Sequence, residues 1–296
     1  MLLQRLTKAL LKSKSIQANL RKLLRKVSNV SCTLINLNNK RETQYLASLF
    51  RYELMKRTII ITLITLWCSI RAIAGVVDHD VMYKAYLDNK IATWGIELKK
   101  YTASQQLSAD DKLEISNYLY GYIAFLLIDI ENNKSEINKW IDLWDEYLDE
   151  IEKAKGKRAD VFAYRSANNA YKAKVRTGGV MIYGARSLND LNRAMNCDAN
   201  NIVAIELKGN TKFYMPSLVG GDKREAIEWF EKALKIIDAN PTPLYRWNRC
   251  AITLCMAQSY EKIGNSTKAI EICKKELLRE PNFTYLRDVY LPSLQK

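Results

Sequence analysis

Four polar residues recur along one face of a helix that the sequence predicts over residues 159–176. They are Arg165, Asn169, Lys172 and Arg176, and a helix of about 3.6 residues per turn places this spacing on one side. Arginine, lysine and asparagine side chains can donate hydrogen bonds to a carboxylate, and those from the charged groups are the strongest. The stripe therefore predicts a binding site for the carboxylate of a peptide or of a small acid.

The same stripe has a simpler interpretation. The preceding predicted helix, 134–155, is acidic and carries Asp142, Asp145, Glu146, Asp149 and Glu150. An acidic helix beside a basic one forms ordinary ion pairs or a solvated face. Both interpretations stay open on the sequence alone.

Other residue patterns offer little for catalysis. The only histidine, His79, is expected to be exposed, and no phosphate-binding loop or nucleophile elbow occurs. Carboxylate pairs such as Asp145 and Asp149 could do acid–base chemistry, but exposed helices commonly carry such pairs. The sequence therefore predicts a protein without catalytic residues, metal site or cofactor, and a helical enzyme with an unrecognised carboxylate site is the alternative.

The cysteines of residues 75–296 include no Cys-x-x-Cys pair, which argues against zinc or thioredoxin-like chemistry. We expect buried thiols, although an exported protein could form a disulfide that includes Cys197 or joins Cys255 to Cys273. The four are Cys197, Cys250, Cys255 and Cys273.

Paired glycines, Gly220 and Gly221, begin the segment "GGDKREAIEWF". Such a pair before a helix N-terminus could cradle an anion. A turn followed by Asp222 as the N-cap residue, with Glu225 as its capping-box partner, explains the same residues. We expect the cap.

Charge is distributed very unevenly along the 296 residues. The net charge of +14 by itself suggests a nucleic-acid or anionic-membrane partner. Residues 1–74, however, hold 14 of the 46 Lys and Arg residues and only two acidic ones, so residues 75–296 carry just +2. The nearly neutral remainder predicts no nucleic-acid partner.

The stretch "MKRTIIITLITLWCSIRAIAG" marks the point where the charge changes. Lys56 and Arg57 precede a run of 13 mostly apolar residues, and Ala72 and Ala74 stand where a signal peptidase requires small residues. The run is shorter than the roughly 20 residues of a spanning helix. We expect residues 55–74 to be a signal peptide cleaved near Ala74, although a buried strand also fits Ile59–Ile61.

If residues 55–74 are a signal peptide, Met55 is expected to be the true initiator methionine, and residues 1–54 precede it. They are expected to be an upstream mis-start or a disordered, amphipathic basic extension. A membrane-surface or nucleic-acid-binding helix and a mitochondrial transit peptide are the functional alternatives.

Residues 75–296 are expected to be all-α. Glycine and proline are scarce, and helix-period segments are separated by short breaks. The predicted helices cover residues 78–101, 110–130, 134–155, 159–176, 186–197, 200–214, 222–238, 244–262 and 266–279.

The last of these segments resemble the tetratricopeptide repeat (TPR) family. In a 34-residue unit that begins at Cys250, small residues stand at Ala257 and Ala269, a glycine turn at Gly264, and the closing proline at Pro281. Thr253 and Glu276 depart from the pattern. A degenerate repeat unit precedes this one, and its small and aromatic positions are Ala204, Gly209, Ala226, Phe230 and Ala233. A third and weaker unit lies further upstream and ends with Ala194 and Asp198.

This resemblance implies a TPR-like α-solenoid of about four antiparallel helix pairs, whose first helices line a concave face. It implies an exported, non-catalytic adaptor for a protein or peptide, located in the periplasm of a bacterium or secreted, with no stable membrane span in the mature chain. The long "YMPSLVGGD" loop also resembles loops of periplasmic TPR proteins such as the T-component of TRAP transporters. An accessory ligand-binding component of a solute transporter is therefore the alternative function.

Overall fold

The computed structural model describes residues 52, 55–56, 76–103 and 106–295. The chain divides into two compact units, Met1–Ala74 and Gly75–Lys296, and the fold below is that of the second unit. The predicted extension and signal peptide, 1–54 and 55–74, lie outside the described residues except for Tyr52, Met55 and Lys56. Both stay predictions.

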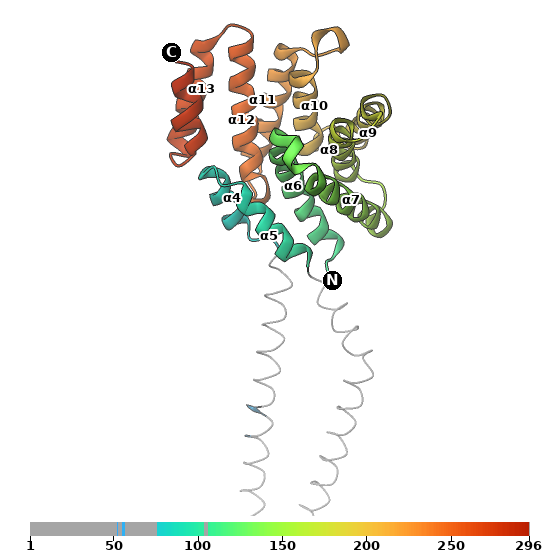
Figure 1. The fold of residues 1–296 in the computed structure, drawn as a ribbon. Helices are drawn as coiled ribbons and strands as arrows, with labels where there is room; N and C mark the ends of the chain where they lie inside the picture. Colours follow the sequence, from blue (N-terminus) through green and yellow to red (C-terminus); the bar gives the residue numbers. More distant parts are fainter. Residues whose placement is uncertain (1–51, 53–54, 57–75, 104–105, 296) are drawn as a thin grey trace, which may run out of the picture. The chain divides into compact units, whose positions relative to one another are not determined.

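Every regular element among the described residues of the second unit is helical, so the protein is all-α as the composition predicts (Figure 1). The α-helices are α4 (His79–Leu87), α5 (Ala92–Thr102), α6 (Ala109–Leu126), α7 (Ile130–Lys155), α8 (Ala159–Val175), α9 (Ala185–Cys197), α10 (Ile202–Tyr214), α11 (Lys223–Ala239), α12 (Arg246–Lys262), α13 (Ser266–Arg279) and α14 (Leu291–Ser293). Short 3₁₀ or π-helical segments are η1 (Leu127–Asp129), η2 (Val180–Gly184), η3 (Ser217–Val219), η4 (Pro243–Tyr245) and η5 (Leu286–Tyr290).

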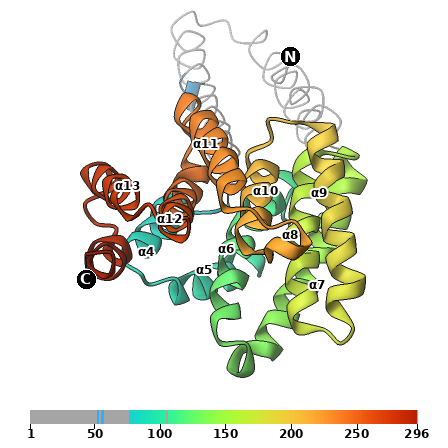
Figure 2. The same cartoon turned by 90° about the horizontal axis from the view of Figure 1, so that it is seen from above.

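Successive helices pack in pairs: α6 with α7, α8 with α9, α10 with α11, and α12 with α13. Figure 2 shows the first helix of each pair toward the centre and α7, α9, α11 and α13 at the periphery. The additional helices α4 and α5 pack against α12 and α6. There the indole of Trp94 meets that of Trp247 edge-to-face, with 5.3 Å between ring centroids.

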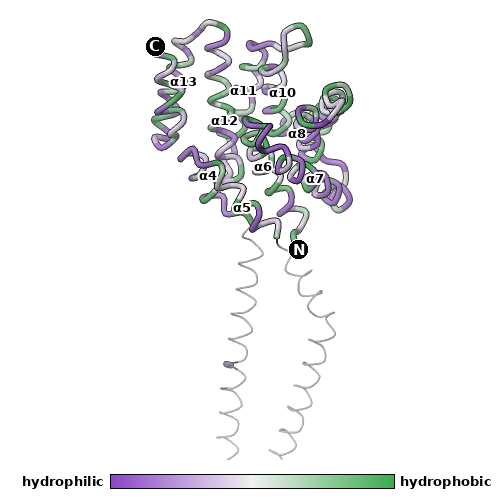
Figure 3. The backbone as a smooth tube through the Cα atoms, viewed as in Figure 1, coloured by the Kyte–Doolittle hydropathy of each residue, from purple (hydrophilic) through white to green (hydrophobic). Residues whose placement is uncertain are grey.

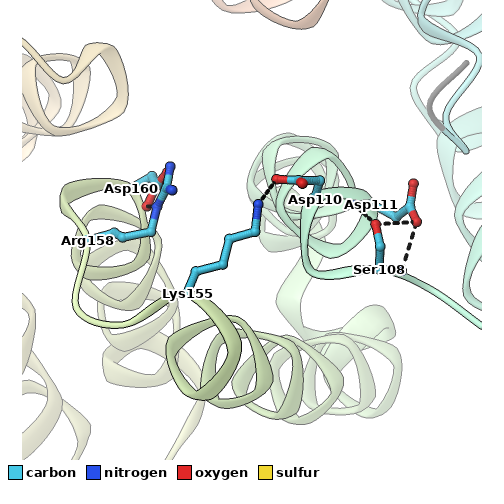
Figure 4. Close-up of polar contacts among 6 residues, drawn as sticks. All are labelled: Ser108, Asp110, Asp111, Lys155, Arg158 and Asp160. Carbon is cyan, nitrogen blue, oxygen red and sulfur yellow. Dashed lines mark hydrogen bonds and ion pairs between the residues drawn. The ribbon is translucent and has the colours of Figure 1, made fainter. Parts of the chain in front are cut away.

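Ion pairs at the ends of α6 and α7 show that these helices are antiparallel. Asp110 at the start of α6 pairs with Lys155 at the end of α7 (Figure 4). A capping box begins α6, because the Asp111 amide donates to Ser108 Oγ at 3.1 Å and the Ser108 amide donates to Asp111 Oδ2 at 2.8 Å. In the same region, Arg158 Nη2 lies 2.6 Å from Asp160 Oδ2 at the start of α8.

The small residues noted in the sequence allow close helix contacts. Gly209 of α10 lies against the ring of Phe230 on α11. Ala257 of α12 and Ala269 of α13 are fully buried in one cluster with Cys273. The turn between these helices contains Gly264 with a φ of +84°, a backbone conformation that favours glycine.

Asp222 caps α11 as predicted. Its Oδ1 atom accepts hydrogen bonds from the amides of Arg224 at 2.8 Å and Glu225 at 3.2 Å. The capping-box part of the prediction differs, because the Glu225 carboxylate lies 2.6 Å from Lys212 Nζ and accepts from Trp229 Nε1 instead. The two glycines have separate reasons: Gly220 takes a φ of +98°, and a Cβ atom on the buried Gly221 would lie 1.8 Å from the carbonyl oxygen of Met215.

Several helix boundaries differ from the prediction, and the segments predicted as 110–130 and 134–155 follow each other without a break as α6, η1 and α7. The segment predicted as one helix, 78–101, is α4 and α5, because Asn89 takes a left-handed φ of 56° between them. Beyond α13, η5 and α14 continue the helical structure and bury Leu286 and Tyr290. Phe283, Leu286 and Tyr290 fill the cluster beside α12 and α13, which the sequence periodicity alone did not indicate.

One helical stretch in the described residues, Ala109–Lys155, is long and apolar enough to cross a membrane by length and composition, and half of its apolar window is buried inside the fold. It consists of α6, η1 and α7.

Candidate functional site

The predicted stripe on α8 faces the acidic helix α7. Arg165 Nη2 lies 2.8 Å from Asp149 Oδ1 and 2.7 Å from Glu152 Oε2. Lys172 pairs with Asp145, and Arg176 pairs with Asp142. The structure thus forms the interhelical ion pairs that the sequence left as the alternative to a carboxylate site.

The remaining stripe residue points to α9. Asn169 Nδ2 donates to Asp190 Oδ2 at 3.1 Å. All four predicted residues therefore have protein partners within the fold, and the carboxylates of α7 already balance the three cations. Whether these residues bind a ligand stays a prediction.

The candidate acid–base pair is engaged in the same contacts. Asp145 accepts from Asn168 Nδ2 at 2.7 Å and pairs with Lys172, while Asp149 pairs with Arg165. His79 was expected to be exposed, but it is partly buried. Its Nδ1 atom lies 2.8 Å from the Tyr118 hydroxyl. Burial, and next the charge of Arg246, lower the pKa of His79.

The four cysteines among the described residues are free thiols. Cys250 and Cys273 are buried as predicted, Cys255 is partly exposed and Cys197 is exposed. Burial raises the pKa of Cys255 and of Cys273 to about 12. Because the thiolate is the nucleophile, this shift lowers the reactivity of both thiols near neutral pH.

A buried carboxylate lies at the centre of the inner helices. Glu206 of α10 is 3% exposed. It accepts a hydrogen bond from the Tyr120 hydroxyl at 3.1 Å and another from Asn248 Nδ2 at 3.0 Å. Burial raises its pKa to about 7, although these hydrogen bonds act in the opposite direction. Buried acids with such a pKa are candidates for functional groups.

The surroundings of Glu206 are aromatic and polar. The Tyr120 ring stacks on that of Tyr171 and lies 5.9 Å from that of Trp247, centroid to centroid. Asn210 Nδ2 donates to the Tyr120 hydroxyl at 2.8 Å, while the amide oxygen of Asn210 is buried without a hydrogen-bond partner. A ligand that donates a hydrogen bond would satisfy this oxygen.

Sequence reasoning missed Glu206. One signal was available: Glu206 is the only charged residue in the otherwise apolar run "IVAIEL". An acid inside such a run is either solvated on an exposed face or buried with polar partners.

The same network closes the inner face of the helix array. Asn117 of α6 donates to Asn248 Oδ1 at 2.9 Å and to the Leu244 carbonyl at 2.8 Å. It accepts from the Tyr164 hydroxyl of α8 at 3.2 Å. The first and last pairs of the array are thereby joined, and the chain's own side chains fill the place where a TPR array would present an open groove.

These contacts also fix the direction of the inner helices. On α6, Asn117 meets Tyr164 near the start of α8, and Tyr120, one turn later, meets Tyr171 near its end. Tyr120 also meets Asn210, near the end of α10. The helices α6 and α8 therefore run in the same sense. The chain reverses between α8 and α9 and again between α9 and α10, so α10 also runs in this sense, and the turns that follow the three helices lie at the same end of the array.

Those three turns expose large apolar side chains, and we call this set the turn edge. Leu218 is 99% exposed, Met181 88% and Ile128 81%. The loop between α10 and α11 projects beyond its helices (Figure 1) and carries a hydrophobic tip (Figure 3). The members of the turn edge are Ile128, Val180, Met181, Ile182, Tyr214, Leu218 and Val219.

The turns at the opposite end differ. In the described connections 156–158, 198–201 and 240–242, no large hydrophobic side chain is exposed. Exposed apolar residues normally occur singly, and their concentration at one end indicates a contact surface.

No family model matches the chain, and no curated protein sequence matches it. Among solved structures, the HusA haemophore from Porphyromonas gingivalis is similar at 17% identity and a TM-score of 0.46, over 64% of this chain and 96% of that chain. A likeness of this degree says nothing about what this chain binds.

Proposed function

We propose that this chain is an exported, non-catalytic adaptor of TPR type that acts in the bacterial cell envelope, as a periplasmic or secreted protein. Four successive helix pairs, with small residues where their helices approach each other, support the TPR assignment. The charged n-region, apolar run and Ala-x-Ala sequence of residues 55–74 support export.

The observation that carries this proposal is the turn edge. Peptide-binding helical repeats present a concave surface, but here hydrogen bonds between α6 and α12 occupy the inner face. The exposed side chains Met181 and Leu218 lie at the ends of α8 and α10 instead. The adaptor therefore docks on its envelope partner through the turn edge, and the sequence-based expectation for that partner is a protein or peptide.

Photo-crosslinking in cells tests the adaptor function. A photoreactive residue is placed at Leu218 or at Met181, and for comparison at Glu228, which is exposed on α11. We expect discrete adducts with an envelope component from the two turn-edge positions only. Equal labelling from all three positions would contradict docking through the turn edge.

A second candidate function is an accessory component that binds a small ligand for a solute transporter. Glu206 favours it, because this buried carboxylate has neutral hydrogen-bond donors and lies near the unpartnered amide oxygen of Asn210. The matching ligand would carry an amine or hydroxyl group on an apolar body. Native mass spectrometry of the protein purified from the envelope fraction would show the ligand as added mass, lost in Glu206→Gln. Detection of the unliganded mass alone would rule against this function.

A further inference from the structure

The turn edge includes two separate groups of exposed apolar side chains, which we call tips. Val180, Met181 and Ile182 form one tip in the π-helical turn η2, while Leu218 and Val219 form another in η3. A protein partner would need a preformed pocket for each tip. A lipid bilayer accepts apolar side chains without such pockets, because its acyl region is fluid.

Aromatic residues stand at the base of both tips. Tyr183 belongs to η2 itself, and Tyr214 is the last residue of α10 before η3. Tyrosine is enriched at the boundary between membrane and water, where its ring contacts acyl chains and its hydroxyl stays hydrated.

Basic residues surround the tips. The guanidinium groups of Arg176 and Arg186 lie 5.9 and 5.6 Å from the ring centroid of Tyr183. Lys174 is exposed just before η2, and residues 174–186 include no acid. The loop that contains η3 lies between Lys212 and the pair Lys223 and Arg224, with Asp222 as its single acid.

Some of this positive charge is already balanced. Arg176 pairs with Asp142, and Lys212 pairs with Glu225. The exposed residues Lys174, Arg186 and Arg224 have no carboxylate within ion-pair distance among the described residues. These cations complement anionic headgroups, which attract lysine and arginine near the membrane surface.

We propose that the turn edge docks on an anionic phospholipid surface, inserting Met181 and Leu218 below the headgroups while the surrounding cations contact phosphates. This inference rests on the proposed adaptor function, since it names the envelope component that the turn edge meets. The polar turns at the opposite end then face away from the membrane.

Vesicle sedimentation tests the inference. Residues 1–74 are basic and apolar and would bind vesicles themselves, so the protein used is the mature chain from Gly75, a compact unit by itself. The vesicles contain phosphatidylglycerol and phosphatidylcholine at about 1:3, or phosphatidylcholine alone, at low and high ionic strength. The variants are Met181→Ser/Leu218→Ser and, as a matched control, Leu278→Ser, whose side chain is 87% exposed on α13.

We expect the unmodified chain to bind the anionic vesicles at least about tenfold more tightly than the neutral ones, and less tightly at high salt. The double variant should lose about tenfold in affinity, while Leu278→Ser should bind normally. The substituted side chains are exposed, so circular dichroism should show unchanged folding. Equal binding by the double variant and the unmodified chain, or no preference for anionic vesicles, would overturn the inference.

The crosslinking experiment separates this inference from the adaptor function. Protein adducts from Leu218 together with absent vesicle binding would identify a protein partner, so the lipid inference would fail and the adaptor function would stand. Absence of adducts and of vesicle binding would refute both.

Discussion

The ring of Phe230 packs so closely on Gly209 that a Cβ atom at position 209 would lie 2.4 Å from it. Phe230 is completely buried, so its ring can move away only by displacing neighbouring core side chains. We predict that Gly209→Ala lowers the free energy of unfolding by about 1–3 kcal/mol, because the added methyl group overpacks the contact between α10 and α11. Urea denaturation measures the change.

Gly184 provides the matched control. It is also helical, but the nearest atom to an added Cβ would be 4.0 Å away. Alanine restricts the unfolded chain more than glycine does, so Gly184→Ala should leave stability unchanged or raise it by about 0.5–1 kcal/mol. If both substitutions had the same effect, close packing at Gly209 would not be the cause.

Glu206 should make stability depend on pH. Its folded-state pKa of about 7 lies above the ordinary value of 4.5, so the folded protein retains the proton between these pH values while the unfolded chain releases it. The free energy of unfolding therefore decreases as the pH rises from about 4.5 to about 7. Relative to Glu206→Gln, the unmodified protein should lose about 3 kcal/mol across this window.

Urea denaturation at a series of pH values gives this difference directly. Glu228→Gln serves as control, because Glu228 is exposed on α11, and its pH profile should parallel that of the unmodified protein. Parallel profiles for Glu206→Gln and the unmodified protein would show that Glu206 does not hold the proton in the folded state.

Helix positions were predictable because they depend on local periodicity. The segment predicted as 266–279 coincides with α13, and the predicted cap Asp222 begins α11. The break at Asn89 was missed because no glycine or proline marks it, and asparagine is the commonest substitute for glycine in that conformation.

The inner network could not be predicted in the same way. The hydrogen bond between Asn117 and Asn248 joins residues that are 131 positions apart, and no local pattern specifies such a pairing.

The role of the stripe on α8 could not be predicted for a different reason. Its spacing was visible, but one helix alone does not show whether Arg165 and Arg176 face a ligand or the acidic side chains of α7.

Removal of two stripe cations distinguishes these roles. We predict that Arg165→Gln/Arg176→Gln lowers stability by about 1–2 kcal/mol, since Asp149 and Asp142 are largely exposed and only Glu152, the second partner of Arg165, is mostly covered. Adduct formation from position 218 should be unchanged, because α7 already balances both charges. Loss of the adduct in a variant that still unfolds at the normal urea concentration would instead support a carboxylate-binding role for the stripe.

Glu276 departs from the small residue expected at its position in a TPR unit, and the structure provides a partner for it. The side chain is 3% exposed, and Arg249 Nη1 donates to its two carboxylate oxygens at 2.7 and 2.6 Å. Arg249→Met would leave this carboxylate buried without its cation, which costs about 3–5 kcal/mol. Glu276→Ala should cost less, because Arg249 keeps its contact with Asp238 at 2.8 Å.

The double variant Arg249→Met/Glu276→Ala measures the coupling between the two residues. It should be more stable than the sum of the single effects predicts, by about 1–3 kcal/mol, because removal of the arginine is harmful mainly while the carboxylate remains. Urea denaturation of the four proteins gives the cycle. If the two single effects were additive, the buried Glu276 carboxylate would not depend on Arg249. A glutamate at this position of the repeat would then need no neighbouring arginine.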